Sequence, residues 1–278
     1  MFLLVGLPGC DAQLQRCTDH LGNAARGYVS KKIARVSSAI WHIVENVWGP
    51  ITGANIELTG QSASVPQTTI MASTTSSKEF LQVIQNRRTI YELSKKPILA
   101  DDALVQYIRE LVKEAPSSFN VQSSRVVVLL GDQHSKYWNE IVPRAVSASV
   151  SDEALETMRP KLQNFAKAYG TILFFEDEKL IKTQQEQFPM FASGFPTWSL
   201  HASGMAQIYT WSGLEAVGYG ANLQHYGNLT GEMLKKEYSL PESYQIQSEM
   251  VFGYPEGLAQ EKAYNPDHER VIAYGHSA

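Results

Sequence analysis

The sequence predicts an α+β domain with one central sheet. Three short apolar runs, 126–130, 171–175 and 247–252, have the length and composition of buried strands. Longer stretches between them carry apolar residues at helical spacing. Residues 49–77 are rich in Gly, Ser, Thr and Pro, which predicts a flexible linker ahead of the domain.

The composition is that of an ordinary globular protein. The 278 residues are 44% hydrophobic and 19% charged, and they allow one large domain or two small ones. The net charge of −4 argues against a nucleic-acid partner, which normally requires a basic face. No apolar run approaches the ~18 residues of a membrane span. We therefore expect neither a nucleic-acid partner nor a membrane partner.

Residues 1–70 are expected to be an N-terminal extension and linker outside the folded domain, which is expected at 71–278. Within the extension, Val29–Val47 fits an amphipathic helix. The apolar start Met1–Leu7 is short and lacks the basic residues of a secretory signal. We expect a cytoplasmic protein, with the nucleus as a further location and mitochondrial import as an alternative.

The two cysteines, Cys10 and Cys17, both lie in this extension. Two thiols are too few for a disulfide framework. Because the rest of the chain has no cysteine, redox chemistry there would require a bound cofactor.

The elements of the domain follow from local signals. Ser77 is a plausible N-cap for a first helix with an apolar stripe at Phe80, Leu81 and Ile84. A second helix at 103–114 must end before Pro116. The remaining expected elements are strand 126–130, turn 131–132, helix 135–145, strand 171–175, helix 199–217 and strand 247–252, which Gly253 ends.

The helix at 199–217 carries small residues on roughly one face. Ala202, Ala206, Gly213 and Ala216 would let another helix approach closely, which suggests a dimer contact. The alternative is an ordinary core helix within one subunit.

The segment Ala115–Gln122 is the most informative in the chain. It places a Pro-Ser-Ser turn, Asn120 and Gln122 directly before the strand that follows. Hydroxyls, amides and free backbone donors can hold a flat, polar-edged heterocycle. A capped turn between a helix and a strand is the simpler alternative.

This segment resembles the flavin site of the FMN-dependent nitroreductase family. Three further stretches agree in order: 86–90 with the Arg-rich phosphate segment, 218–226 with the Leu-Gln-His-Tyr signature of a fungal and bacterial branch, and 261–271 with the C-terminal phosphate contacts. The resemblance covers about 78–274 and does not include 1–70.

The resemblance implies a nitroreductase fold, in which a mixed sheet is flanked by helices in an intertwined homodimer. It implies FMN as cofactor, NAD(P)H as hydride donor and a nitroaromatic, quinone or other flat molecule as acceptor. No protein side chain is expected to be catalytic, since the flavin performs the chemistry. The implied cofactor-binding residues are Arg87, Arg88, Thr89, Pro116, Ser117, Ser118, Asn120, Gln122, Leu223, Gln224, His225, Lys262 and Arg270.

The basic members of this set suit a phosphate. Arg forks onto phosphate oxygens, and Lys serves as a point charge. Taken alone, Arg87 and Arg88 would more simply be solvated charges at a helix end. The family often has another basic residue at the position of Tyr91, where this chain departs from it.

Two other patterns argue against a dinucleotide-binding loop and against a metal site. The Gly218–Gly220 pair follows a helix, and Leu223 stands where a dinucleotide loop needs a third small residue. The resemblance instead implies a tight helix exit whose backbone at 223–225 lies beside the flavin ring. His225 has no neighbouring His or acid at metal-ligand spacing, so we expect no metal site.

The aromatic run from Phe188 to Trp198 is the expected substrate wall, with Phe191, Phe195 and Trp198 as contacts. Aromatic residues ahead of a buried helix are otherwise core residues. Two alternative functions remain at this stage. One is a flavin-binding regulator in stress or lipid signalling with incidental reductase activity, and the other is a dehalogenating or flavin-degrading enzyme on the same fold.

Overall fold

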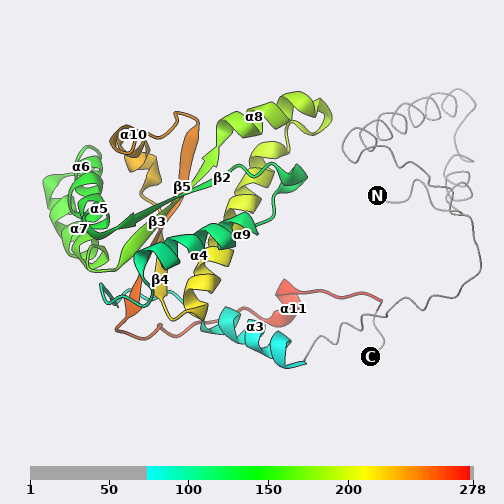
Figure 1. Ribbon diagram of the computed structural model, residues 1–278, viewed down its shortest axis with the longest axis horizontal. Coiled ribbons are helices and arrows are strands. Elements are labelled where there is room, and N and C mark those ends of the chain that lie inside the picture. Colours follow the sequence, from blue (N-terminus) through cyan, green and yellow to red (C-terminus); the bar gives the residue numbers. More distant parts are fainter. Residues whose placement is uncertain (1–73, 276–278) are drawn as a thin grey trace, which may run out of the picture. The chain divides into compact units, whose positions relative to one another are not determined.

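The computed structural model describes residues 74–275 (Figure 1). The expected extension 1–70 and the helix expected at 29–47 lie outside the described residues, so the domain boundary stays a prediction. Among the helices within 74–275, none is long and apolar enough to span a bilayer.

The centre of the domain is a five-stranded sheet. Its order is β1-β5-β3-β2, and β4 also pairs with β5. Every pairing between these strands is antiparallel, and an isolated bridge between Thr89 and Ala221 is parallel. The expected mixed sheet is therefore antiparallel throughout its named strands, which are β1 (Leu93–Ser94), β2 (Ser124–Leu130), β3 (Gly170–Asp177), β4 (Gly220–Gln224) and β5 (Tyr244–Pro255).

Helices cover both faces of the sheet (Figure 1). On one face lie α4 (Asp101–Lys113) and α9 (Phe195–Ala216). On the other lie α5 (Gly131–Lys136), the π-helical turn Tyr137–Ile141, α6 (Val142–Ser147), α7 (Asp152–Phe165) and α10 (Gly227–Glu237). The remaining helical segments are α3 (Thr74–Asn86), the turn Ser118–Asn120, α8 (Glu178–Gln187), the turn Pro189–Phe191 and α11 (Asp267–Arg270).

Strand β3 joins the two cores because its side chains alternate between them. Leu173 and Phe175 pack with the α5–α7 and α10 side, whereas Ile172 and Phe174 pack with α4 and α9. Every residue of β3 is buried, as the continuous apolar run predicts for a strand with both faces covered.

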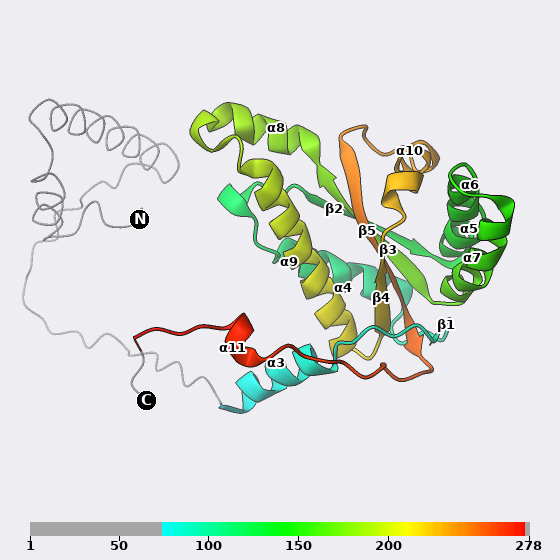
Figure 2. The same ribbon diagram turned by 180° about the vertical axis from the view of Figure 1, so that it is seen from behind.

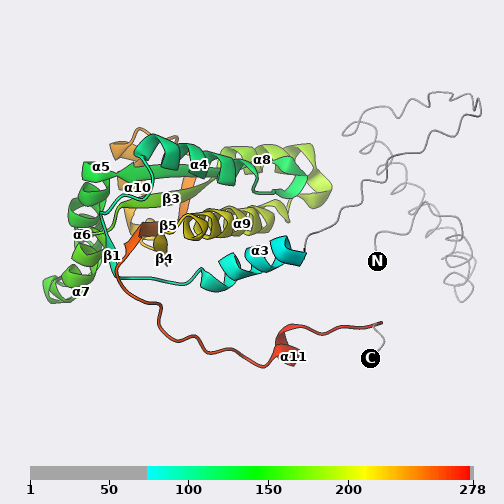
Figure 3. The same cartoon turned by 60° about the horizontal axis from the view of Figure 1, so that its bottom comes forward.

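The C-terminal segment leaves the sheet after β5. Figure 3 shows it running away from the layers to α11. Its apolar side chains are exposed: Leu258, Tyr264, Val271, Ile272 and Tyr274.

The expected elements are present with changed limits. Gly253 does not end the last strand, because β5 continues through it to Pro255 and Gly253 pairs with Gly220 of β4. The first helix begins at Thr74, so Ser77 lies within it, and the expected turn at 131–132 already forms the start of α5. Gly131 has a φ of 53°, a conformation that glycine adopts at little cost. The long helix starts at Phe195, because Pro196 fits the first turn of a helix. Local patterns gave no prediction for β1, β4, α7, α8 or α10.

Three of the four small residues predicted to form one face of α9 are buried, and the fourth, Ala216, is exposed. Ala202 and Ala206 are buried, and a side chain at Gly213 would collide with Leu111 of α4. These residues let α9 lie close to α4 and the sheet inside one subunit. The interpretation as a dimer contact is therefore wrong for Ala202, Ala206 and Gly213, for which the alternative of a core helix holds.

A buried hydroxyl joins the sheet to the helices beside it. The Trp138 ring N–H donates to Thr171 Oγ1 at 2.8 Å, and His134 Nδ1 lies 2.9 Å from the same oxygen. All three residues are fully buried. Burial, followed by the charge of Lys95, lowers the pKa of His134 to about 4, so its ring is neutral at pH 7.

We expect Thr171→Val to lower the free energy of unfolding by roughly 2–4 kcal/mol, because two buried ring nitrogens lose their partner while the shape is kept. The control is Thr171→Ser, which keeps the hydroxyl and loses a methyl worth about 1 kcal/mol. Urea denaturation measures both. Equal stability of the valine and serine variants would contradict this role of the hydroxyl.

Candidate functional site

The turn after α4 contains an unusual backbone. Phe119, Asn120 and Gln122 have φ values of 54°, 52° and 50°, in the left-handed region that few residues other than glycine adopt. Asn tolerates this region, but a bulky Phe does so at a cost of about 1–3 kcal/mol. Strain of this kind collects where a binding site fixes the backbone.

Hydrogen bonds hold the turn in this shape. The Gln122 N–H donates to Ser117 Oγ at 2.9 Å, and Arg125 Nη1 donates to the Gln122 carbonyl at 2.6 Å. Next along the chain, the hydroxyls of Ser123 and Ser124 each donate to the carboxylate of Glu176 at 2.5 Å. The turn is thus attached to the buried strand β3.

Phe119 brings the turn to the expected substrate wall. Its ring centroid lies 4.9 Å from that of Phe188, 5.8 Å from Phe191, 5.4 Å from Phe195 and 6.2 Å from Trp198. Phe195 is buried, whereas Phe119 is 45% exposed. The surface available to a ligand is therefore offered by Phe119 and its partly exposed neighbours. Phe119 was not among the predicted contacts, although it stands inside the segment that carries the resemblance.

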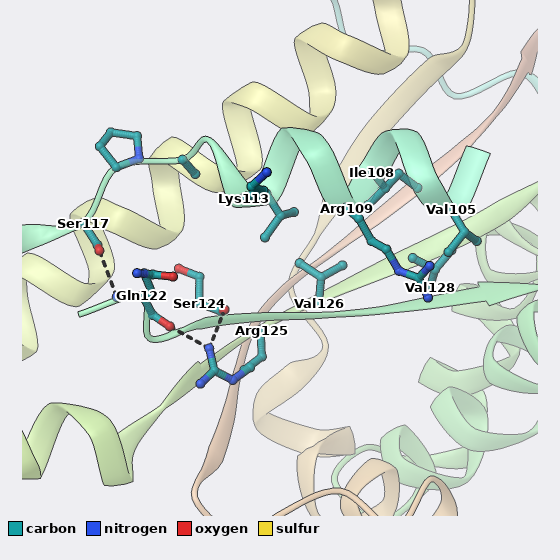
Figure 4. A pocket seen from close by; sticks show the side chains of 13 residues that line it. Val105, Ile108, Arg109, Lys113, Ser117, Gln122, Ser124, Arg125, Val126 and Val128 are labelled. Atoms are coloured by element: carbon teal, nitrogen blue, oxygen red, sulfur yellow. Dashed lines mark hydrogen bonds between the residues drawn. The ribbon is translucent and has the colours of Figure 1, made fainter. Parts of the chain in front are cut away.

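A groove of about 540 Å³ begins at the same turn and runs between α4 and β2 (Figure 4). Pro116, Ser117 and Gln122 line one end of it. Valine side chains form much of its wall, with the cations of Arg109, Lys113 and Arg125 among the lining residues. Ser117 and Gln122 are thus exposed to a space that a ligand or a partner segment can enter.

The Arg-rich segment lies at a different place. The Arg87 guanidinium carbon is 4.5 Å from the centre of the Trp211 ring on α9. Burial, and then the charge of Arg88, lowers the pKa of Arg87, while Glu215 raises it. Within the described residues, Arg87 forms no ion pair. Its charge is held in place and lacks a bonded anion there.

Strand β4 lies directly beside this segment. Ile90 N–H donates to the Ala221 carbonyl at 2.9 Å, and Asn222 Nδ2 donates to the Ile90 carbonyl at 2.9 Å. Gln224 Nε2 in turn donates to Asn222 Oδ1 at 2.8 Å. The structure thus places Thr89 and Ile90 beside Ala221 and Asn222, so the chain segments that carry the predicted residues Arg87–Thr89 and Leu223–His225 are bonded to each other. The buried Asn222 makes this connection, and sequence reasoning did not assign it a role.

The predicted C-terminal contacts are only partly gathered. Arg88 Nη2 donates to the Gln260 carbonyl, which places the start of the C-terminal segment beside the Arg-rich segment. Lys262 follows two residues later, with its ammonium 4.8 Å from the ring centre of Tyr264. Arg270 lies on α11 and is exposed.

The two halves of the predicted site lie at opposite ends of α9 (Figures 1 and 2). Phe195 and Trp198 contact Phe119 near the first turn, whereas Trp211 contacts Arg87 near the last. Thirteen residues separate Trp198 from Trp211, which corresponds to roughly 20 Å along the helix axis. One subunit alone therefore does not assemble the predicted set around a single ligand.

Glu249 on β5 is a buried acid next to the β4 half, and it too lacked a predicted role. Its carboxylate accepts from the Tyr226 N–H at 3.0 Å and from the Tyr137 hydroxyl at 3.0 Å. Burial raises its pKa to about 7, although both hydrogen bonds oppose the shift. A carboxylate inside the apolar run of a strand could have signalled this residue, since buried acids require partners.

Comparison with known proteins gives matches that span the turn and the segments on both sides of it. A profile of the nitroreductase family matches residues 84–254. The chain belongs to the nitroreductase family. The match includes the turn at 115–122, the Arg-rich segment and the strand ending at Gln224.

Individual relatives support this membership. Nitroreductase FRM2 of Saccharomyces cerevisiae is 36% identical over 189 residues, which are 66% of this chain and 92% of the relative. Nitroreductase CinD from Lactococcus lactis, in complex with nicotinic acid, is 41% identical with a TM-score of 0.66, over 70% of this chain and 100% of that one. A nitroreductase with bound FMN from Desulfitobacterium hafniense shares the fold, at 18% identity and a TM-score of 0.52, over 71% and 98%.

Family membership confirms the resemblance that the sequence motifs carry. It identifies the nitroreductase fold and an oxidoreductase of that type. The residue assignments are a separate matter, because they depend on where the ligand lies.

The raised pKa of Glu249 predicts how stability depends on pH. Between pH 4.5, the ordinary pKa of a glutamate carboxyl, and about pH 7, an unfolded chain ionises this carboxyl while the folded protein keeps it protonated. Stability contributed by the protonated form is therefore lost as pH rises through this window. Glu249→Gln should gain roughly 2–4 kcal/mol relative to wild type between pH 4.5 and pH 8.

Urea titrations of both proteins at several pH values measure this difference. The neutral His134 titrates in the opposite sense, but it is common to both proteins and cancels. Stability curves that stay parallel over the whole window would contradict the prediction.

Proposed function

We propose that the protein is an FMN-dependent oxidoreductase that uses NAD(P)H to reduce nitroaromatics, quinones or similar flat acceptors. The observation that carries this proposal is the strained turn at 115–122, in a chain of the nitroreductase family. The N–H groups of Asn120, Val121 and Gln122 donate within the turn and fix its shape. The turn thereby presents serine hydroxyls and side-chain amides that suit the polar edge of a flavin.

The phosphate of the cofactor is assigned to the basic residues around β4. Arg87 suits this role because Trp211 orients its guanidinium and it forms no ion pair within the described residues, with Glu215 acting on its charge only from beyond ion-pair distance. Arg88 lies beside Gln260, and Lys262 is close along the chain from there. Thr89 contributes a hydroxyl from the bridge to β4. Arg270 joins this set by family resemblance alone.

The ring of the cofactor is assigned to two groups. The backbone of Leu223, Gln224 and His225 borders one edge, and Asn222 holds it in place from behind. Pro116, Ser117, Ser118, Asn120 and Gln122 supply the other group. FMN, when bound, supplies the hydride chemistry, and the protein's donors stabilise the negative charge at the ring's pyrimidine edge.

The acceptor is assigned to the aromatic surface around Phe119. Phe191 and Trp198 are partly exposed beside it, and flat molecules stack on such rings. Nicotinic acid in the Lactococcus lactis relative is a molecule of this shape. No protein nucleophile is required, so the aromatic residues select the acceptor by shape and stacking.

A homodimer follows from the same geometry. Because the two halves of the site lie at opposite ends of α9, a second subunit must supply the turn that faces the Arg-rich segment. An exposed stripe on α9, formed by Leu200, Gly204 and Ile208, offers a contact surface. Phe80 and Ile84 of α3 are also exposed, and they extend the apolar surface beside α9. Exposed apolar groups of this extent are typical of subunit interfaces.

We expect Arg87→Ala and Arg270→Ala each to weaken FMN binding roughly tenfold to a hundredfold, because each removes a charge-assisted bond worth about 1.5–3 kcal/mol. Fluorescence titration of the apoprotein with FMN measures the dissociation constant. Arg159→Ala is the control, since Arg159 pairs with Glu156 on an exposed face of α7. Full flavin content in both test variants would exclude these two contacts.

We expect Ile208→Arg to produce monomers that have lost stoichiometric FMN, because an unpaired charge in an interface costs several kcal/mol. Gln163→Arg places the same charge on an exposed position of α7 and should leave the dimer intact. Sedimentation and flavin absorbance are read on the same samples. A folded Ile208→Arg monomer that keeps one FMN per chain would refute the shared site.

A further inference from the structure

The backbone that follows β4 is held from behind by a closed set of hydrogen bonds. Glu249 Oε2 accepts from the Tyr226 N–H at 3.0 Å, and Glu249 Oε1 accepts from the Tyr137 hydroxyl at 3.0 Å. Thr230 Oγ1 lies 3.3 Å from the Tyr137 hydroxyl and donates to the Tyr226 carbonyl at 3.3 Å. Both backbone groups of Tyr226 are thereby bonded.

This arrangement is buried although the residue it supports is at the surface. Glu249, Tyr137 and Thr230 are fully buried, whereas His225, which precedes Tyr226, is exposed. Glu249 also pairs with Gln224 across the β4–β5 ladder. One side chain therefore controls the backbone on which residues 223–225 depend, of which only His225 is exposed.

We propose that Glu249 is a positioning residue, which holds the 224–226 backbone in the position that the bound flavin requires. The inference rests on the proposed function, because that function assigns the 223–225 backbone to the flavin edge. Glu249 does not touch the cofactor, and it acts through the Tyr226 N–H.

The arrangement also responds to protonation. An ionised Glu249 accepts from both Tyr226 and Tyr137. A protonated Glu249 must instead donate its new proton to Tyr137, whose hydroxyl then turns toward Thr230. Because a carboxylate is a stronger acceptor than a carboxyl, the bond to Tyr226 weakens on protonation.

The groups around Glu249 determine that its protonation occurs near neutral pH. Burial dominates the rise of its pKa to about 7, and the Tyr226 N–H, the Tyr137 hydroxyl and its own backbone N–H oppose it. The facing titratable side chains are Tyr137 from the π-helical turn and Tyr226 at the start of α10. Burial raises the pKa of both tyrosines, so neither ionises in this range.

The first experiment measures how well the Tyr226 amide is protected from hydrogen exchange in the absence of the cofactor. Hydrogen exchange of the Tyr226 amide is followed by mass spectrometry in the apoprotein. Glu249→Met keeps the size and removes both acceptors, so exchange should become at least about tenfold faster. Glu249→Gln restores an acceptor and should return exchange to within about threefold of wild type. Ser248→Ala is the matched control on the same strand, since its buried hydroxyl has no partner among the described residues.

The second experiment measures the effect on the flavin. The dissociation constant for FMN and the visible spectrum of the bound flavin are recorded from pH 5.5 to 8.5. Wild type should show a change with a midpoint near 7, as the pKa of Glu249 does. Glu249→Gln imitates the protonated acid, so it should lack this change and match wild type at low pH over the whole range. This comparison does not depend on whether Glu249→Met folds.

Two results would overturn the inference: unchanged exchange in Glu249→Met, or a Glu249→Gln protein that keeps the pH dependence of wild type. A wild-type protein that binds no FMN would overturn the proposed function. The exchange comparison would then still decide whether Glu249 fixes this backbone, so the two failures are distinguishable.

Discussion

Strand β5 determines where the β4 half of the proposed site lies. It pairs with β3 along most of its length, with β4 beside its second half and with β1 at its end. Because β4 is bonded to it, β5 fixes the exit toward His225 and the bridge to the Arg-rich segment. The same strand carries Glu249, which supports that exit from the buried side.

An acid in the middle of this strand lowers the stability of the fold, and it fixes the position of the backbone that it supports. An aliphatic residue at 249 would avoid the desolvation that raises the carboxyl's pKa. It would also leave the Tyr226 N–H without an acceptor and the Tyr137 hydroxyl with Thr230 as its remaining partner. The strand therefore exchanges some free energy of folding for a backbone with one defined position, which is typical of sites that must orient a ligand.

The turn at 115–122, at the other end of α9, is likewise an unfavourable local arrangement that hydrogen bonds hold in one position. Its left-handed residues are unfavourable by themselves, and the bonds from Ser117 and Arg125 compensate for them. Phe119 packs among aromatic residues from the 188–198 region, so the turn and the aromatic wall behave as one unit. A relaxed turn would connect α4 to β2 equally well. The conformational strain of this turn is therefore explained if the ligand interacts with it.

The sequence by itself determined the fold class and the family. Continuous apolar runs are decisive for buried strands, and the spacing of Pro116, Ser117, Ser118, Asn120 and Gln122 is specific enough to identify a family. It also placed the helices at 101–113 and 195–216 to within a few residues, because helical periodicity is a local signal.

Only the tertiary structure decided which of these residues meet. Small residues on α9 indicate a close contact, but their sequence does not say whether the partner is α4 or another subunit, and burial shows that it is α4. The short strand β4 escaped prediction because its pairing with β5, not its own pattern, makes it a strand. The roles of Asn222, Trp211 and Glu249 likewise arise from contacts between segments far apart in the chain, where local sequence carries no information about distance.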